Sequence, residues 1–224
     1  MPSEPVSRIS AVVFDMDGVL TDTEAVWDDV RRGLAAEDGA AWPDDATDRM
    51  MGMSTAEWSE YLATTVGLHG DAAAVAERAV SRVAERYREH LPLMPGAVAA
   101  VERMASRWPL GLASSSPRRL IDAILDMLDL TPLFRATVST EEVQAGKPAP
   151  DGYRRACELL GVEPATAVAV EDSSNGLRSA SAAGMRVVAV PHPGHPPAGD
   201  ALALAAVRLG SLDELTPELV ASLG

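Results

Sequence analysis

The sequence has little of what secreted, membrane-spanning or nucleic-acid-binding proteins need. It contains one cysteine, Cys157, so no disulfide can form within the chain and nothing indicates an oxidising compartment. No apolar run approaches the roughly 18 residues that cross a bilayer, and the N-terminal segment does not have the pattern of a signal peptide. The 19 basic residues are outnumbered by 33 acidic ones, which opposes non-specific binding to nucleic acid. We therefore expect a cytoplasmic protein with neither a membrane nor a nucleic-acid partner.

Aromatic residues are also scarce, at 4% of the chain, so alanine, valine and leucine must fill most of the interior. The other proportions are ordinary: hydrophobic residues make up 47% and charged residues 23%, which excludes a disordered or fibrous chain. The length of 224 residues fits one domain, or one domain that carries a sizeable insertion.

Short apolar runs alternate with helical patterns along most of the chain, which indicates an α/β fold. A weaker run, AAVRLG, precedes a last helix near the C-terminus. The unbroken apolar character of the runs is typical of parallel strands that helices cover on both faces, and it predicts a doubly wound sheet. The clear runs end at Asp15, Ser115, Thr140, Asp172 and Val190.

Between the first and second runs, the pattern becomes helical throughout and contains no convincing strand. We interpret this stretch, residues 23–91, as an inserted helical domain, and its two junctions as hinges if both flank one cleft. Ser54 with Glu57 fits a capping box, and Gly67 fits a helix stop. The remaining segments, 1–22 and 92–224, form the α/β core. The expected helices of the insertion cover residues 24–37, 54–66 and 71–90.

The first run leads into FDMDGVLTDTE, which places Asp15 and Asp17 two positions apart. An extended chain turns both side chains to one side, and Gly18 can make a sharp turn after them. Two carboxylates held in this way favour a bound cation, although they could also simply cap a turn. The carboxyl ends of strands are where doubly wound sheets bind ligands. An EF-hand is excluded, because Val19 and Leu20 stand where its loop needs Asp or Asn and then Gly.

Three further segments place polar residues at or beside strand ends. Ser114 and Ser115 lie in ASSSP, just before a predicted helix whose amino end attracts anions, although serines there can be N-caps only. Lys147 lies in AGKPAPDGY, a loop that prolines stiffen, and it can bind a phosphate or simply contact water. Glu171 and Asp172 begin EDSSNG, where capping does not explain two adjacent acids.

The four segments complement one another chemically. Asp15, Asp17 and Asp172 offer only oxygen ligands, the kind of site that suits Mg²⁺. Ser114 and Lys147 suit a phosphate. Because all of them follow successive strands, we expect them in one pocket.

Together the segments resemble the four motifs of the haloacid dehalogenase-like hydrolases. The similarity is to the branch with a helical cap after the first motif, which includes β-phosphoglucomutase and small sugar-phosphate phosphatases, and it extends over about residues 12–190. The resemblance implies a Rossmann-like core and a cap domain. It implies that Asp15 is the nucleophile, that Asp17 is the general acid and base, and that Ser114, with Ser115 beside it, and Lys147 bind the phosphate.

The resemblance also implies a Mg²⁺ cofactor. Asp172 would bind the ion with Asp15 and the backbone carbonyl of Asp17, and Glu171 would contact it through water. The attacking Asp15 must then be ionised, whereas Asp17 must hold a proton for the leaving oxygen, so the pKa of Asp17 should lie above that of Asp15. The acid at position 17 also favours phosphate esters, because the dehalogenases and phosphonate hydrolases of the superfamily lack it.

We therefore expect a monomeric, Mg²⁺-dependent phosphatase that acts on a small sugar or polyol phosphate. A phosphomutase is the alternative, but Trp27 replaces a histidine of the mutases and Thr55 replaces their cap arginine. Trp27 is also the best candidate in the cap for contact with the substrate. A non-catalytic binding module on the same fold is a third hypothesis. Four other cap arginines could replace the missing one: Arg49, Arg82, Arg86 and Arg88.

Overall fold

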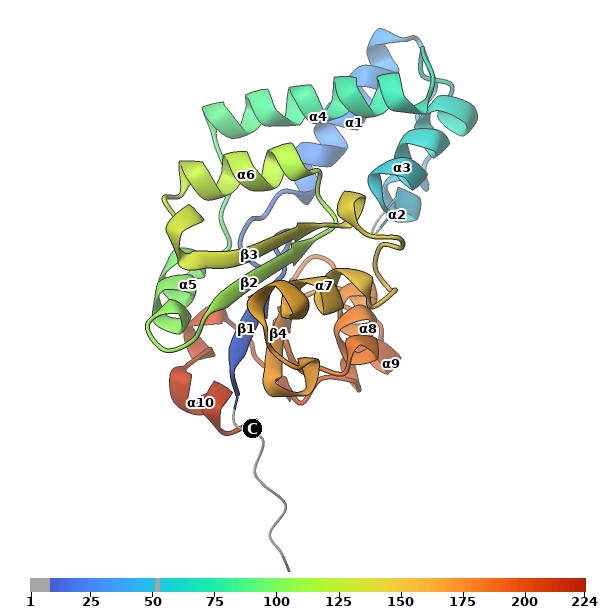
Figure 1. Cartoon of the computed structure of the whole chain (residues 1–224). Coiled ribbons are helices and arrows are strands. Elements are labelled where there is room, and N and C mark those ends of the chain that lie inside the picture. Colours follow the sequence, from blue (N-terminus) through green and yellow to red (C-terminus); the bar gives the residue numbers. More distant parts are fainter. Residues whose placement is uncertain (1–8, 51–52) are drawn as a thin grey trace, which may run out of the picture.

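The computed structural model describes residues 9–50 and 53–224. Its centre is a parallel sheet of six strands in the order β3-β2-β1-β4-β5-β6 (Figure 1). The strand order reverses between β1 and β4, the point at which doubly wound sheets bind their ligands. The strands are β1 (Ala11–Phe14), β2 (Leu110–Ser114), β3 (Phe134–Ser139), β4 (Ala167–Glu171), β5 (Arg186–Ala189) and β6 (Val207–Arg208).

Helices cover both faces of the sheet, because side chains of both faces are apolar. Val12 and Phe14 belong to the core on the side of α5 (Ala97–Ala105) and α6 (Arg118–Met127). Ala11 and Val13 belong to the opposite core, beneath α7 (Asp151–Leu160) and α8 (Ser174–Ala183). The predicted α/β fold with a doubly wound sheet is confirmed. Two short helices complete the core: α9 (Gly199–Leu202) and α10 (Pro217–Ala221).

The inserted helices lie beyond one end of the sheet as a cap (Figure 1). The capping box is present as predicted, since Ser54 accepts from the Glu57 N–H and its own N–H donates to Glu57 Oε2 at 2.8 Å. The helix continues as one π-helical turn, Leu62–Val66, and ends at Gly67, whose φ is +87°. One short helix of the cap, α2 (Ala46–Met50), was not expected. The cap helices are α1 (Glu24–Glu37), α2 (Ala46–Met50), α3 (Thr55–Tyr61) and α4 (Ala72–Glu89).

The two connections between cap and core run side by side. The N–H of Asp22 donates to the carbonyl of Pro92 at 3.0 Å, and Thr21 pairs with Leu93. A second contact joins cap and core away from these crossings, where Arg119 of α6 donates to Glu77 Oε1 of α4 at 2.8 Å. Such an exposed ion pair contributes little to stability, so it can break without great cost. This arrangement suits a cap that opens about the two crossings.

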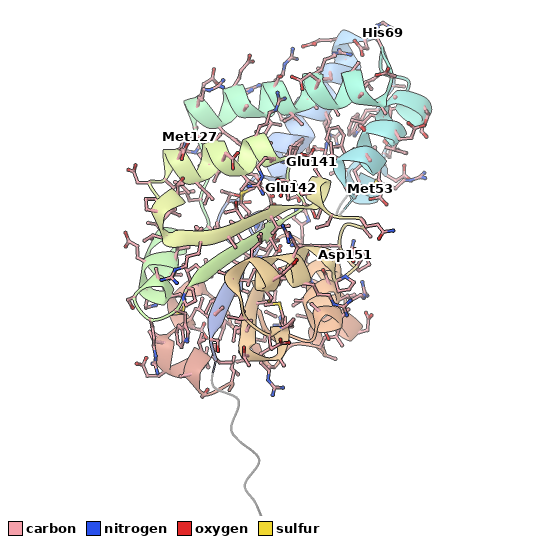
Figure 2. All side chains as sticks on the ribbon, in the orientation of Figure 1. Met53, His69, Met127, Glu141, Glu142 and Asp151 are labelled. Carbon is pink, nitrogen blue, oxygen red and sulfur yellow. The ribbon has the colours of Figure 1, made fainter. Side chains whose placement is uncertain are left out.

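Figure 2 places Met53 at the end of the cap that faces the core and His69 at the far end. At that far end, Arg78 forms two hydrogen bonds with Asp38, both 2.8 Å long, which link α4 to the end of α1. In the described part of the chain, no helix has the length and apolar character needed to cross a membrane.

Candidate active site

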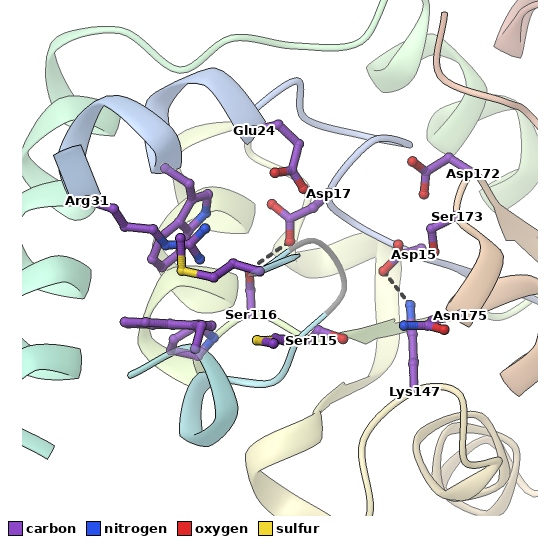
Figure 3. A pocket seen from close by; sticks show the side chains of 15 residues that line it. Asp15, Asp17, Glu24, Arg31, Ser115, Ser116, Lys147, Asp172, Ser173 and Asn175 are labelled. Atoms are coloured by element: carbon purple, nitrogen blue, oxygen red, sulfur yellow. Dashed lines mark hydrogen bonds and ion pairs between the residues drawn. The ribbon is translucent and has the colours of Figure 1, made fainter. Parts of the chain in front are cut away.

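The first strand delivers Asp15 to a buried position at the carboxyl end of the sheet. The Asp15 N–H donates to the Val170 carbonyl at 3.0 Å, which fixes it beside the end of β4. Lys147 Nζ lies 2.8 Å from Asp15 Oδ1 (Figure 3). It also lies 2.6 Å from Glu171 Oε1. The hydroxyl of Tyr153 donates to the same Glu171 oxygen at 2.8 Å. The lysine from the proline-stiffened loop therefore bridges two carboxylates from neighbouring strands.

Asp15, Glu171 and Asp172 form a compact acidic cluster in which one oxygen from each lies within 4.8 Å of the others. All three residues are buried. Asp172 Oδ1 is buried without a hydrogen-bond partner among the described residues. Buried carboxylates need compensating charge, and an all-oxygen set with an unpaired oxygen fits a hard divalent cation. The cluster could therefore hold Mg²⁺, but its third carboxylate belongs to Glu171 and not to Asp17, which the sequence argument grouped with Asp15 and Asp172.

The protonation of this cluster depends on how much positive charge it holds. Burial and the carboxylate of Glu171 raise the pKa of Asp15 to about 8, and the same causes raise the pKa of Asp172 well above its usual range. Burial opposes the charge of Lys147, but Asp15 and Glu171 outweigh that effect and raise the pKa of the lysine. One lysine does not balance three buried acids. The ionised Asp15 that the sequence argument requires therefore calls for a cation in the cluster.

Asp17 lies in a different environment from Asp15, as the sequence predicted. Thr23 Oγ1 donates to Asp17 Oδ1 at 2.6 Å, and Ser116 Oγ donates to Asp17 Oδ2 at 2.7 Å (Figure 3). Three hydroxyl groups surround it in all, because Ser114 Oγ also lies 3.4 Å from Oδ2. These groups hold the carboxyl of Asp17 toward the cap side of the pocket.

The serines after β2 divide their contacts in a way that the sequence did not reveal. Ser114 is buried, and its Oγ accepts from the Ser116 N–H at 3.0 Å. Ser115 and Ser116 line the cavity directly, whereas Ser114 does not. Ser116 was not predicted as a site residue, because all three serines of ASSSP fit an N-cap equally well. Its only signal was its position beside the proline that precedes α6.

The cavity between cap and core has a volume of about 120 Å³ and joins the predicted residues in one place. Trp27 lines it, as expected for the leading cap candidate. None of the four cap arginines considered above lies among its lining residues. The lining consists of Asp15, Asp17, Glu24, Trp27, Arg31, Met50, Met53, Trp58, Ser115, Ser116, Pro117, Lys147, Asp172, Ser173 and Asn175.

The four arginines point to other partners. Arg49 packs on the ring of Tyr61, and Arg82 and Arg86 pair with acids at the surface of α1. Arg88 is exposed. The cap arginine in the cavity is Arg31, which the sequence argument did not consider. The signal was available, because positions 24, 27 and 31 share one face of a helix.

Two glycines allow the backbone to approach the acidic residues. Gly18, predicted to make a sharp turn, has a φ of +83°, and a Cβ there would overlap the carboxylate of Asp172. Gly176, in the first turn of α8, passes so close to Glu171 that a Cβ would overlap its carboxylate. The amide groups of residues 172 and 173 donate to Glu171 Oε2 at 3.1 and 3.3 Å. Glu171 therefore serves as the fixed centre around which this loop folds.

Gly176→Ala is expected to destabilise the protein, even though alanine usually stabilises a helix by up to about 1 kcal/mol relative to glycine. The new methyl group must displace the buried Glu171 carboxylate, an overpacking change that costs about 1–3 kcal/mol. Thermal unfolding should show a melting temperature several degrees lower. The matched control is Gly152→Ala in the first turn of α7, where a Cβ meets nothing within 4 Å. Equal melting temperatures for the two variants would contradict this account of Glu171.

Comparisons with known proteins agree with this geometry. A family model described as haloacid dehalogenase-like hydrolase matches residues 9–184. Hexitol phosphatase B of Escherichia coli (strain K12) is 34% identical over 226 residues, covering 93% of this chain and 95% of that protein. The phosphorylated carbohydrates phosphatase of Thermotoga maritima is 34% identical over 186 residues, covering 82% of this chain and 86% of that one. The crystal structure of CbbY from Rhodobacter sphaeroides, in complex with phosphate, superimposes with a TM-score of 0.80 at 26% identity, covering 96% of this chain and 99% of that one.

Proposed function

The chain belongs to the haloacid dehalogenase-like hydrolases, and from this premise we propose that it is a phosphatase for a small phosphorylated sugar or polyol. The observation that carries the proposal is the single cavity that brings together Asp15, Asp17, Lys147 and Asp172 beneath the helical cap. Two of the similar proteins are named as phosphatases of hexitols and of phosphorylated carbohydrates, which supports the substrate class.

We propose Mg²⁺ as the cofactor. Asp15 and Asp172 would hold the ion with the backbone carbonyl of Asp17, and Glu171 would contact it through water. The unpaired Asp172 oxygen and the excess of buried acid over base support this assignment. Once bound, the ion would supply positive charge that offsets the negative charge of the phosphoryl oxygens.

In the proposed reaction, an oxygen of Asp15 attacks phosphorus, and the bond between phosphorus and the ester oxygen breaks. Asp17 gives its proton to the departing oxygen, which leaves as an alcohol. Asp17 then takes a proton from water, and the resulting hydroxide attacks the phosphorus of the aspartyl phosphate. Inorganic phosphate leaves and Asp15 is regenerated. Lys147 and Ser115 bind the phosphoryl oxygens, where fixed donors have their largest effect on rate. Ser114, which the sequence pattern also assigned to the phosphate, does not line the cavity and instead accepts from the Ser116 N–H in the turn after β2.

The cap has two roles in this proposal. Residues 23–91 move as one unit about the adjacent crossings, and closure excludes bulk water from the aspartyl phosphate until the substrate has bound. The cap residues in the cavity then contact the part of the substrate that does not react. This division into a core of residues 1–22 and 92–224 and a cap of residues 23–91 is the one that the sequence pattern favours.

We favour a phosphatase over a phosphomutase. The two share the aspartyl phosphate and differ in whether water or a sugar hydroxyl accepts the phosphoryl group. Trp27, in the position of the mutase histidine, packs against Trp58 at a centroid distance of 5.6 Å and offers no proton-transfer group. Thr55, in the position of the mutase arginine, cannot bind a second phosphate as an arginine does. A non-catalytic role is disfavoured, because every residue type that the chemistry needs lies in one cavity.

The test is phosphate release from a panel of phosphorylated sugars and polyols, with Mg²⁺ and with EDTA. We expect one phosphate per alcohol formed, and only when Mg²⁺ is present. Incubation of a sugar phosphate with a bisphosphate primer should give no isomer. An isomer formed faster than free phosphate would establish the mutase instead. Purified protein without turnover of any member of the panel would contradict both.

A further inference from the structure

Arg31 is a half-buried residue in the lining of the cavity, and its guanidinium has neither an ion pair nor a hydrogen bond within the described residues. Its Cζ lies 4.8 Å from the centroid of the Trp27 ring and 4.9 Å from that of Trp58. Its Nε is buried without a partner. Burial lowers the pKa of Arg31 to about 10, so the group remains charged at neutral pH. The indole faces partly compensate for lost hydration, but they accept none of its N–H groups in ordinary hydrogen bonds.

Glu24 is a second charged group in the same cavity without an ion pair or hydrogen bond to any described residue. It lies two helical turns before Arg31 on α1, and Figure 3 shows its carboxylate directed toward Asp17. Burial and the nearby Asp17 raise the pKa of Glu24, whereas Arg31 opposes that rise. Arg31 offers only donors and ionised Glu24 offers only acceptors. The wall of the cavity formed by α1 therefore carries an acceptor near Asp17 and a donor farther away.

The balance of charge decides what kind of group Arg31 can receive. A phosphate ester and a divalent cation largely cancel each other. The acidic residues in the lining outnumber the basic ones by four to two, and still by three to two when Asp17 holds its proton. A second anionic group on the substrate would add to this excess, whereas a hydroxyl group adds no charge and can both donate and accept. The acidic set is Asp15, Asp17, Glu24 and Asp172, and the basic set is Arg31 and Lys147.

We propose that Arg31 determines specificity by donating to hydroxyl oxygens at the far end of a neutral polyhydroxyl chain, while Glu24 accepts from hydroxyls nearer the phosphate. The proposal rests on the phosphatase function and adds to it a preference for substrates with a neutral far end. Trp27 and Trp58 hold the guanidinium in place, so little side-chain entropy is lost when the substrate binds. A substrate too short to reach Arg31 gains nothing from it.

Three substrates test the proposal: sorbitol 6-phosphate, 6-phosphogluconate and 2-hydroxyethyl phosphate. The first two have the same carbon chain and differ at the far end, which is a hydroxymethyl group in one and a carboxylate in the other. The third is too short to reach Arg31. We expect the wild-type enzyme to prefer sorbitol 6-phosphate to 6-phosphogluconate at least about tenfold in kcat/KM, because the carboxylate adds negative charge to a lining in which acidic residues already outnumber basic ones.

Arg31→Met should lower kcat/KM for sorbitol 6-phosphate by about 10- to 100-fold, mainly through KM, because it removes the donors but keeps much of the packing. The loss for 2-hydroxyethyl phosphate should be at least about tenfold smaller. Arg31→Lys should recover part of the difference between the two substrates. The control is Arg32→Met, the next residue on α1, which is exposed and pairs with Asp28 at 2.6 Å. It should leave kcat/KM unchanged for all three substrates.

The possible outcomes test the role of Arg31 and the proposed phosphatase function separately. Equal losses on the long and the short substrate would reduce Arg31 to a structural role and overturn the inference, while the phosphatase function would stand. A wild-type preference for 6-phosphogluconate that Arg31→Met removes would show that Arg31 binds an anion, which also overturns it. Wild-type enzyme that hydrolyses none of the three substrates would overturn the proposed polyol phosphatase function itself. Thermal melts of each variant identify any loss that comes from unfolding.

Discussion

Asp15→Asn is expected to reduce phosphate release by at least about 10³-fold, equivalent to about 4 kcal/mol of transition-state stabilisation. The amide nitrogen has no lone pair available for attack on phosphorus, and the amide oxygen is a far weaker nucleophile than a carboxylate. No neighbouring group can take over, because Glu171 is held by Lys147, Tyr153 and the amides of its own loop. Phosphate release under saturating substrate and Mg²⁺ measures the effect.

The fold should survive this change. Asp15→Asn keeps the size of the side chain and replaces a carboxyl group that two other buried acids crowd, so the melting temperature without metal should be unchanged or higher. Asp45→Asn is a matched control, since Asp45 is exposed in the cap and lies 3.7 Å from Arg49. It should retain full activity. Substantial turnover by pure, folded Asp15→Asn protein would refute the assignment of the nucleophile.

The sequence predicted those parts of the site that the strand ends fix. Asp15, Lys147 and Asp172 meet in the structure because each follows or adjoins the end of a parallel strand near the switch in strand order. Glu171 lies beside them, bound to Lys147 and to its own loop. Their proximity follows from topology alone, and topology was visible in the apolar runs. Their roles in catalysis remain predictions.

The residues that were missed depend on local packing rather than topology. Ser116 reaches Asp17 only because the turn after β2 directs its hydroxyl there, and sequence does not distinguish it from Ser115. Arg31 reaches the cavity because α1 and α3 pack with their tryptophans against it. The expected cap arginines were chosen by their type and position along the chain, which says nothing about the side of the cap on which they lie. Helix packing, and hence specificity, is the part that sequence patterns specify least.

The second large effect expected concerns Asp172, whose carboxylate should favour metal binding but destabilise the metal-free protein. Asp172→Asn should abolish Mg²⁺-dependent phosphate release, since it removes a charged ligand for the ion, and yet should stabilise the metal-free protein. The cluster packs three buried acids around one lysine, and the Asp172 oxygen without a partner gains nothing from its charge. An amide in that place removes repulsion and supplies donors for Asp15.

The stability of the metal-free protein should fall as pH rises. The folded pKa of Asp15 is raised to about 8, above its usual value of 3.8, so between these values the folded protein binds more protons than the unfolded chain. The contribution of this group to the stability of the metal-free wild type should therefore be fully present below about pH 4 and should be lost progressively as pH rises toward 8. The stability of Asp172→Asn should fall less steeply with rising pH, because one carboxylate that repels Asp15 is gone.

Mg²⁺ should reverse which protein is the more stable, so that wild type melts at a higher temperature than Asp172→Asn. Binding requires ionised ligands, so the rise in melting temperature on adding Mg²⁺ should grow from pH 5.5 to pH 8 in wild type and should be nearly absent in Asp172→Asn. Ca²⁺ in place of Mg²⁺ tests whether the site selects by size, without any need for turnover. Urea unfolding with and without EDTA gives the free energies that the melting temperatures only approximate. If adding Mg²⁺ at pH 8 does not change the melting temperature of wild type, the acidic cluster holds protons rather than a cation. Lys147 alone must then neutralise the phosphoryl group.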